Sequence, residues 1–307
     1  MRTLPLLLIL PLLLCSACDE CKQATASQSP AQLTDASVYA GANAYAHCQA
    51  ICNLGPRPTG SAAYEQQLAY LTRYLQMAGW TVTRQPFSLS NGARMTNLHA
   101  VFGTGTEPRP VIVTCHIDTK QGISPNFVGA DDGASAAAAM LELARYLARE
   151  PKLAAGIELV FFDGEESFGR SMTEQDGLYG SRFDVMRRGE TMPTYQINLD
   201  MVGSRNKTIA IPLPDTSEEM LAHYEAVIEE LKLSERHWTA HPGSYLDDHL
   251  PFERAGVKSI NLICDFTRGG WWHTERDNME RICPQSLQET GNVVLALLRR
   301  LLPNTQD

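Results

Sequence analysis

Four short aliphatic runs, separated by helical segments, constrain the fold of this chain more than any other feature. The runs cover residues 111–115, 157–162, 195–200 and 257–263. Helical patterns lie around them, at about residues 132–149, 179–188, 215–233 and 284–302. Apolar runs without alternation are typical of strands buried on both faces, and strands that alternate with helices are typical of parallel sheets.

Two further segments predict an antiparallel hairpin beside these strands. Residues 80–89 alternate between apolar and polar side chains, and residues 95–102 follow an Asn-Gly turn signal. Before them we expect a helix over residues 37–52 and a second helix that Ser61 caps. The sequence therefore predicts an α/β fold, a single domain with a central mixed, mostly parallel β-sheet flanked by helices.

The chain begins with a short apolar segment that resembles an export signal. Residues 4–14 are apolar, follow the single cation Arg2 and are too few to span a bilayer as a helix. The small residues Ser16 and Ala17 precede Cys18, as they do at the cleavage and lipidation site of a bacterial lipoprotein. The expected divisions of the chain are a signal peptide over residues 1–17, a flexible tether over 18–34 and an α/β zinc-dependent catalytic domain over 35–307.

These divisions predict an exported protein, a periplasmic or cell-envelope lipoprotein anchored at Cys18. It would contact a membrane only through the lipid, and simple secretion without lipidation is the alternative. The chain has 26 Lys and Arg against 35 Asp and Glu, which gives a net charge of −9. An acidic chain without a basic cluster argues against nucleic acid as the partner.

The eight cysteines lack the spacing of a structural zinc site. Cys48 and Cys52 lie four residues apart in a predicted helix, so we expect them to pack side by side rather than to pair. The sequence leaves open a disulfide between Cys264 and Cys283.

Polar side chains follow the central runs at the edge of the predicted sheet where a ligand crevice forms. Five strand-end or loop positions offer side chains that can bind a metal, namely His116, Asp132, Glu166, Asp200 and His273. Each motif alone has an ordinary explanation as a helix cap, a turn or a solvated face. Together, several carboxylates on one rim would repel each other unless a cation held them. Because histidine nitrogen and carboxylate oxygen are the ligands of catalytic zinc, the pattern predicts a zinc site.

Six motifs contain these residues. They are His116-Ile117-Asp118-Thr119-Lys120, Gly129-Ala130-Asp131-Asp132, Phe161-Phe162-Asp163-Gly164-Glu165-Glu166, Leu178-Tyr179-Gly180-Ser181-Arg182, Asp247-Asp248-His249-Leu250-Pro251-Phe252 and Trp272-His273-Thr274. The series resembles the motifs of glutaminyl cyclases, which share their α/β fold with the co-catalytic zinc aminopeptidases. The resemblance extends over residues 53–302, nearly the whole expected domain.

The resemblance implies a ligand set. Asp132, Glu166 and His273 match the three ligands of the single zinc ion of a cyclase. In the related aminopeptidases, His116 and Asp200 would hold a second zinc ion, with Asp132 bridging the two. All five ligand types are present in both branches, so the ligands alone leave both metal counts open.

The resemblance also implies catalytic and substrate-binding residues. Glu165 matches the acid–base that shuttles a proton, and Asp200 and Asp247 match the carboxylates that hydrogen-bond around it. The expected substrate contacts are Trp272, Phe162 and Lys120.

The implied reaction converts the N-terminal glutamine of a peptide or protein to pyroglutamate and releases ammonia. A zinc-dependent aminopeptidase is the alternative, and a non-catalytic peptide-binding relative is disfavoured because no ligand is lost. The lysine after the His-x-Asp motif and the tryptophan beside His273 favour the cyclase branch.

The resemblance also bears on three local features, of which one is expected to match the relatives and two differ from the animal enzymes. Relatives hold the peptide bond after the motif aspartate in the cis form, which predicts a cis bond between Asp132 and Gly133. Animal cyclases pair the cysteine before the His-x-Asp motif, whereas Cys115 lacks that partner here and is expected to stay unpaired. Phe168-Gly169-Arg170 stands where the animal enzymes have a tryptophan, which leaves the substrate preference open.

Overall fold

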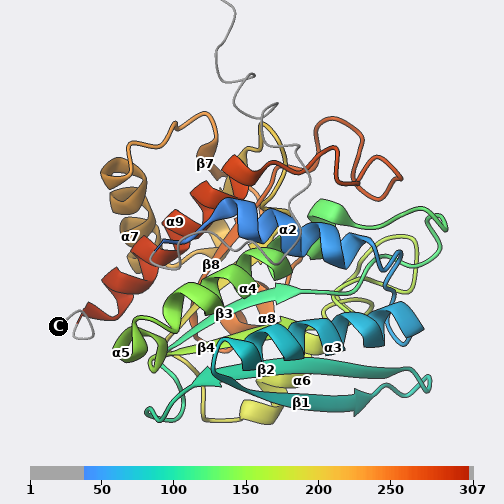
Figure 1. Ribbon diagram of the computed structural model, residues 1–307, viewed down its shortest axis with the longest axis horizontal. Helices are drawn as coiled ribbons and strands as arrows, with labels where there is room; N and C mark the ends of the chain where they lie inside the picture. Colours follow the sequence, from blue (N-terminus) through green and yellow to red (C-terminus); the bar gives the residue numbers. More distant parts are fainter. Residues whose placement is uncertain (1–37, 304–307) are drawn as a thin grey trace, which may run out of the picture.

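A six-stranded mixed sheet organises residues 38–303, the part of the chain that the computed structural model describes (Figure 1). The strand order is β1-β2-β4-β3-β5-β8. The bounds are β1 Trp80–Ser88, β2 Arg94–Phe102, β3 Val111–His116, β4 Ile157–Phe162, β5 Tyr195–Asp200 and β8 Lys258–Ile263. The pairs β3–β4, β3–β5 and β5–β8 are parallel, and β1–β2 and β2–β4 are antiparallel. The predicted α/β fold with a mixed, mostly parallel sheet is confirmed.

Helices cover both faces of this sheet. Figure 1 shows α3 and α4 in front of the sheet, and α6 and α8 behind it. The helices that pack together on the front face are α2 Gly41–Cys52, α3 Ala62–Met77, α4 Ala136–Leu147 and α9 Pro284–Leu301. The others are α5 Pro151–Ala154, α6 Tyr179–Arg188, α7 Glu218–Glu230 and α8 His249–Arg254. Ser61 caps α3 as expected, because its side chain accepts a hydrogen bond from the N–H of Tyr64 at 3.0 Å.

β4 has apolar residues at the successive positions 159–162 because each face of the sheet has its own core. In β4, Leu159 and Phe161 belong to the large core beneath the front helices. Val160 and Phe162 belong to a second core on the opposite face, together with Phe252 of α8. Successive side chains of a strand point to opposite faces, so a strand buried on both faces shows no polar alternation.

A second, two-stranded sheet was not predicted. β6 Ile209–Pro212 pairs in parallel with β7 Trp238–His241. A short 3₁₀ turn, η2 Leu213–Asp215, follows β6. Both strands have only four residues, which is too short for a periodic signal.

The cysteines agree with the sequence analysis at most positions. Cys48, Cys52 and Cys115 are free and buried, as expected. Cys264 is also free, whereas Cys283 is disulfide-bonded. A bond between Cys264 and Cys283 is therefore not formed.

Residues 38–303 contain no helix that combines the length and the apolar character needed to cross a bilayer. The predicted signal peptide, the tether and Cys18 lie outside the described residues.

Candidate active site

The carboxyl ends of the parallel strands meet at one edge of the sheet. His116 is the last residue of β3 and is in register with Phe162, the last residue of β4. Asp200 ends β5, which pairs with the other side of β3. Glu165 and Glu166 lie in the loop directly after β4. The topology thus places three segments that are far apart in the sequence around one point.

Two groups of side chains at this edge have the geometry of metal ligands. One group is His116, Asp132 and Asp200, and the other is Asp132, Glu166 and His273. Within each group the ligand atoms lie within 4.8 Å of one another. All five predicted ligands are therefore brought together, with Asp132 shared between the two groups.

The second group contains a buried oxygen without a hydrogen-bond partner. Nε2 of His273 lies 2.9 Å from Oε1 of Glu166 and 3.3 Å from Oδ2 of Asp132. That Oδ2 atom is buried, yet the contact with His273 lacks hydrogen-bond geometry. In the first group, Nε2 of His116 lies 3.3 Å from Oδ1 of Asp132 and 3.2 Å from Oδ1 of Asp200. An unsatisfied carboxylate oxygen between a histidine and a glutamate fits a bound cation.

A kinked turn before α4 directs Asp132 toward both histidines. This turn, η1 Ala130–Ser135, contains two residues with non-helical dihedral angles, Asp132 (φ −82, ψ 93) and Gly133 (φ 96, ψ −37). A Cβ atom at Gly133 would lie 2.8 Å from the carbonyl oxygen of Asp118, so this position requires glycine.

The predicted cis bond between Asp132 and Gly133 is wrong. The cis peptide bond in residues 38–303 is Glu107–Pro108, and the Asp132–Gly133 bond is trans. The cis geometry was expected to place the Asp132 carboxylate at the metal, and the non-helical dihedral angles of Asp132 and Gly133 bring it between the two histidines without it.

Two aspartates that hold the ligand loops were missed by the sequence analysis. The carboxylate of Asp277 accepts hydrogen bonds from the N–H groups of Asp131 and Asp132, at 2.8 and 3.1 Å. The carboxylate of Asp118 accepts hydrogen bonds from the N–H groups of Glu165 and Glu166, at 3.2 and 3.3 Å. Asp277 lies four residues after His273, so it links two ligand-bearing loops. The only feature of the sequence that points to Asp277 is its position four residues after the predicted ligand His273.

A cavity of about 600 Å³ opens above the second ligand group. Its acidic lining consists of Asp132, Glu165, Glu166, Asp200 and Asp247, and His273 also faces it. His116 does not line this cavity and is buried. Apolar walls enclose the acidic floor, formed by Ile123, Met201, Leu246, Ile263, Phe266 and Trp272. A molecule in the cavity can therefore reach the complete second group but not the complete first group.

Of the three predicted substrate contacts, two line the cavity and one does not. Trp272 lines the cavity, is 39% exposed and stacks on the ring of His273 at 3.9 Å between centroids. Lys120 lines the cavity, but its ammonium group donates a hydrogen bond to the carbonyl oxygen of Ser167 at 2.6 Å. Phe162 does not line the cavity and is fully buried in the core against Phe252. The prediction of a substrate contact at Phe162 is corrected, because the strand directs this side chain into the sheet's rear core.

Burial and the repulsion between neighbouring carboxylates raise the pKa values of Glu165 and Asp200. Burial raises the pKa of Glu165 well above its usual value, and the neighbouring charges of Glu166 and Asp247 raise it further. Burial and the charge of Asp247 raise the pKa of Asp200 to about 8. Burial lowers the pKa of His273, but contacts with Asp132 and Glu166 outweigh burial and raise it to about 10. The cluster therefore favours positive charge among its carboxylates.

Glu165 differs from Glu166 and Asp247 because its carboxyl group forms no hydrogen bond or ion pair with a residue in 38–303. The hydrogen bonds that Glu165 makes within residues 38–303 come from its backbone, whose N–H donates to Asp118 and whose carbonyl accepts from Leu178. In contrast, Asp247 accepts hydrogen bonds from the N–H of Asp248 and the side chain of Asn261, at 2.5 and 2.7 Å. The hydrogen bonds expected between Glu165 and the carboxylates of Asp200 and Asp247 are therefore not formed among residues 38–303, and Glu165 lines the cavity.

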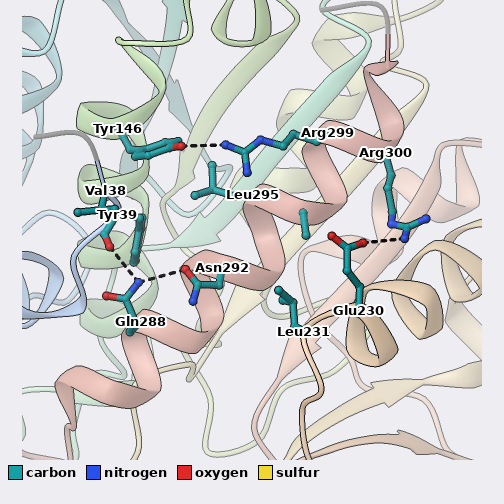
Figure 2. A pocket seen from close by; sticks show the side chains of 11 residues that line it. Val38, Tyr39, Tyr146, Glu230, Leu231, Gln288, Asn292, Leu295, Arg299 and Arg300 are labelled. Atoms are coloured by element: carbon teal, nitrogen blue, oxygen red, sulfur yellow. Dashed lines mark hydrogen bonds and ion pairs between the residues drawn. The ribbon is translucent and has the colours of Figure 1, made fainter. Parts of the chain in front are cut away.

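A second cavity, of about 590 Å³, lies among the residues shown in Figure 2. Its polar side chains are bonded to one another or to nearby backbone. The side chain of Gln288 donates to Tyr39 and Asn292, Arg299 donates to Tyr146, and Arg300 pairs with Glu230 at 2.8 Å. Glu230 is the one acid in its lining. The two cavities are alike in size, but only the first combines a ligand group with a free carboxyl group.

Comparison with known proteins finds peptidases and glutaminyl cyclases that are similar to this chain. The model of peptidase family M28 matches residues 97–298. A glutaminyl-peptide cyclotransferase of Bothrops jararaca is 32% identical over an alignment of 281 positions, which covers 78% of this chain and 75% of that protein. The crystal structure of Porphyromonas gingivalis glutaminyl cyclase has a TM-score of 0.75 and 26% identity, covering 86% of this chain and 99% of that one. A Zn-dependent exopeptidase from Parabacteroides distasonis has a TM-score of 0.76 and 25% identity, covering 87% and 99%.

Proposed function

Because the chain belongs to peptidase family M28 and, within it, to the glutaminyl-peptide cyclotransferases, we propose that it is an enzyme that cyclises N-terminal glutamine. Its substrates are peptides or proteins with N-terminal glutamine, and its products are the pyroglutamyl peptide and ammonia. The observation that carries this function is the unengaged carboxyl group of Glu165, one residue from a metal ligand and facing a cavity with apolar walls.

One zinc ion, held by Asp132, Glu166 and His273, is the proposed cofactor. The fit rests on the unsatisfied Oδ2 atom of Asp132 and on a donor set of one histidine and two carboxylates. These three residues all line the cavity, whereas His116 of the other group does not. When bound, zinc supplies the Lewis acidity that polarises the side-chain amide of the substrate.

Glu165 carries out the proton transfer in this reaction. The α-amine of the substrate attacks the carbon of its own side-chain amide, so a C–N bond forms and the bond to the amide nitrogen breaks. Glu165 accepts the proton that the amine releases and donates it to the departing nitrogen, which leaves as ammonia. The raised pKa of Glu165 makes its carboxylate a stronger base. Asp200 and Asp247 line the cavity with Glu165, and the charge of Asp247 contributes to the raised pKa of Glu165.

The cavity walls suit an intramolecular reaction. The substrate contains both the nucleophile and the electrophile, so the protein needs to orient them and not to supply a water molecule. Phe266 and Trp272, whose rings lie 4.6 Å apart, form an apolar wall next to His273. Such a wall reduces the access of water to the reacting groups on its side of the cavity.

A zinc-dependent aminopeptidase is the second candidate. The observation that favours it is the complete first ligand group, which shares Asp132 with the second group and could hold another ion. Two bridged metal ions are a recurrent arrangement in aminopeptidases.

Ammonia release separates these candidates. We expect rapid ammonia release from a Gln-initiated peptide and none from the matched Asn-initiated peptide, because asparagine would have to close a strained four-membered ring. An Nα-acetylated Gln peptide should also be inert, because its nitrogen is no longer nucleophilic. A coupled ammonia assay measures all three. Ammonia from the acetylated peptide, or none from the Gln peptide, would contradict the proposed function.

We also propose that the chain is exported and anchored through a lipid on Cys18. The support is the apolar segment at residues 4–14 and the small residues before Cys18. Labelling of growing cells with an alkyne fatty acid tests this proposal. We expect label on the wild type and none on Cys18→Ser.

A further inference from the structure

One arginine at the active-site cavity lacks a partner. The cationic residues in the lining are Lys120 and Arg170. Lys120 is buried and donates to both the carbonyl and the hydroxyl group of Ser167. Arg170 is exposed and forms no hydrogen bond or ion pair with any residue in 38–303. Its guanidinium group is therefore available to a bound molecule.

The acids that follow Arg170 in its loop, Glu174 and Asp176, are already engaged. Both carboxylate oxygens of Asp176 accept backbone hydrogen bonds, from Phe168 at 2.8 Å and from Gly169 at 2.7 Å. Glu174 forms a bidentate pair with Arg254, with both distances at 2.8 Å. The unpaired state of Arg170 follows from this bonding pattern and not from a lack of acids in its loop.

The same hydrogen bonds fix the loop that presents Arg170. Asp176 closes a turn over residues 168–176, and the hydroxyl group of Tyr179 also donates to it at 2.8 Å. Thr173 and Asp176 add a pair of backbone hydrogen bonds, at 3.0 and 3.2 Å. The backbone around Arg170 is held in place, so less conformational entropy is lost when its side chain binds a ligand.

The acidic side chains that line the cavity are buried, whereas its unpaired cation, Arg170, is exposed. The carboxylates belong to the ligand groups or lie beside them, and they attract the amino terminus of a peptide. The free positive charge, Arg170, lies on the loop that follows Glu166 and is exposed at the cavity. A peptide residue spans at most about 3.3–3.6 Å, so the second and third residues are the ones that lie nearest to a glutamine held at the ligand groups.

From this arrangement, and resting on the proposed function, we infer that Arg170 selects peptides with an acidic side chain at the second or third residue, after the N-terminal glutamine. The guanidinium group forms a charge-assisted hydrogen bond with the carboxylate of that residue. Arg170 is thus a specificity-determining residue of the active site. It takes no part in the proton transfer, which occurs at the glutamine.

The test compares Gln-initiated peptides that carry glutamate, glutamine or lysine at the second or third position. For the wild type at low salt, we expect kcat/KM for the glutamate peptide to exceed that for the glutamine peptide by about three- to fivefold, as for an exposed ion pair. Arg170→Gln should remove this preference, and Arg170→Glu should transfer it to the lysine peptide. The preference should also decline as salt is added.

Arg268→Gln is the matched control. Arg268 is 89% exposed on its side chain, is already paired with Asp265 at 3.1 Å and does not line the cavity. This variant should keep the wild-type preference. An equal loss in Arg268→Gln and Arg170→Gln would overturn the role of Arg170 and indicate a general effect of surface charge.

The readouts separate this inference from the proposed function. Mass spectrometry reports loss of ammonia or loss of the first residue, and the charge preference can be calculated from either reaction. Anisotropy of a fluorophore at the peptide's C-terminus gives the same comparison as a Kd without turnover. Equal kcat/KM and Kd for the three peptides would overturn the inference while cyclisation still stands. A preference that depends on Arg170, seen in cleavage or in binding without cyclisation, would support the inference and reject the proposed function.

Discussion

His273→Ala is expected to lose zinc and cyclase activity together. Nε2 of His273 lies close to both other members of its ligand group, and it is the group's only nitrogen donor. Its removal leaves Asp132 and Glu166 facing each other without a neutral ligand. Loss of a residue that merely supports a ligand already costs about 10–100-fold in metal affinity, so loss of a ligand should cost more.

The measurement is metal content after dialysis, together with turnover of a Gln-initiated peptide. His237→Ala serves as the control, because His237 is half-buried, bonds the carbonyl of Lys207 at 2.8 Å and belongs to neither ligand group. The control should keep zinc and activity. Full zinc content in His273→Ala would reject the ligand assignment.

Glu165→Gln should lose activity and keep zinc. The change replaces a carboxyl group by an amide of nearly equal size, so the backbone bonds to Asp118 and Leu178 are retained. The amide cannot accept and return a proton, and we expect kcat to fall by about three powers of ten. KM should change little, because the cavity walls are unaltered.

Glu166→Gln is the contrasting variant at the adjacent position. Oε1 of Glu166 contacts His273, so this change should lower zinc affinity as well as activity. The pair therefore separates the base from the ligand. If Glu165→Gln keeps wild-type kcat, another carboxylate is the base, and Asp247 is the next candidate because it lines the same cavity.

The main sheet could be predicted from the sequence because its signals are local. Each central strand is a short buried segment with several aliphatic or aromatic residues, and the predicted boundaries of β4 and β5 agree with the observed strands. The β6–β7 pair could not be found in this way. Its strands have four residues each, and Thr239 and His241 interrupt any apolar pattern in β7.

The ligands could be predicted because parallel strands bring their carboxyl ends together. The residues that position them could not, since their roles depend on contacts across the chain. Asp277 bonds residues 145 and 146 positions away, and no local pattern indicates such contacts. Phe162 shows a related limit, because a stretch of consecutive apolar residues does not reveal which side chains reach the cavity.

Exhaustive incubation of one peptide tests the central claim most directly. The peptide begins with glutamine followed by leucine, and intact-mass spectrometry follows all products. A cyclase gives a single product that is lighter by the mass of ammonia and then stops, because pyroglutamate has no free α-amine. The account predicts that single product for the wild type and unchanged peptide for Glu165→Gln. A ladder of peptides that lack glutamine and then leucine would contradict it and identify an aminopeptidase.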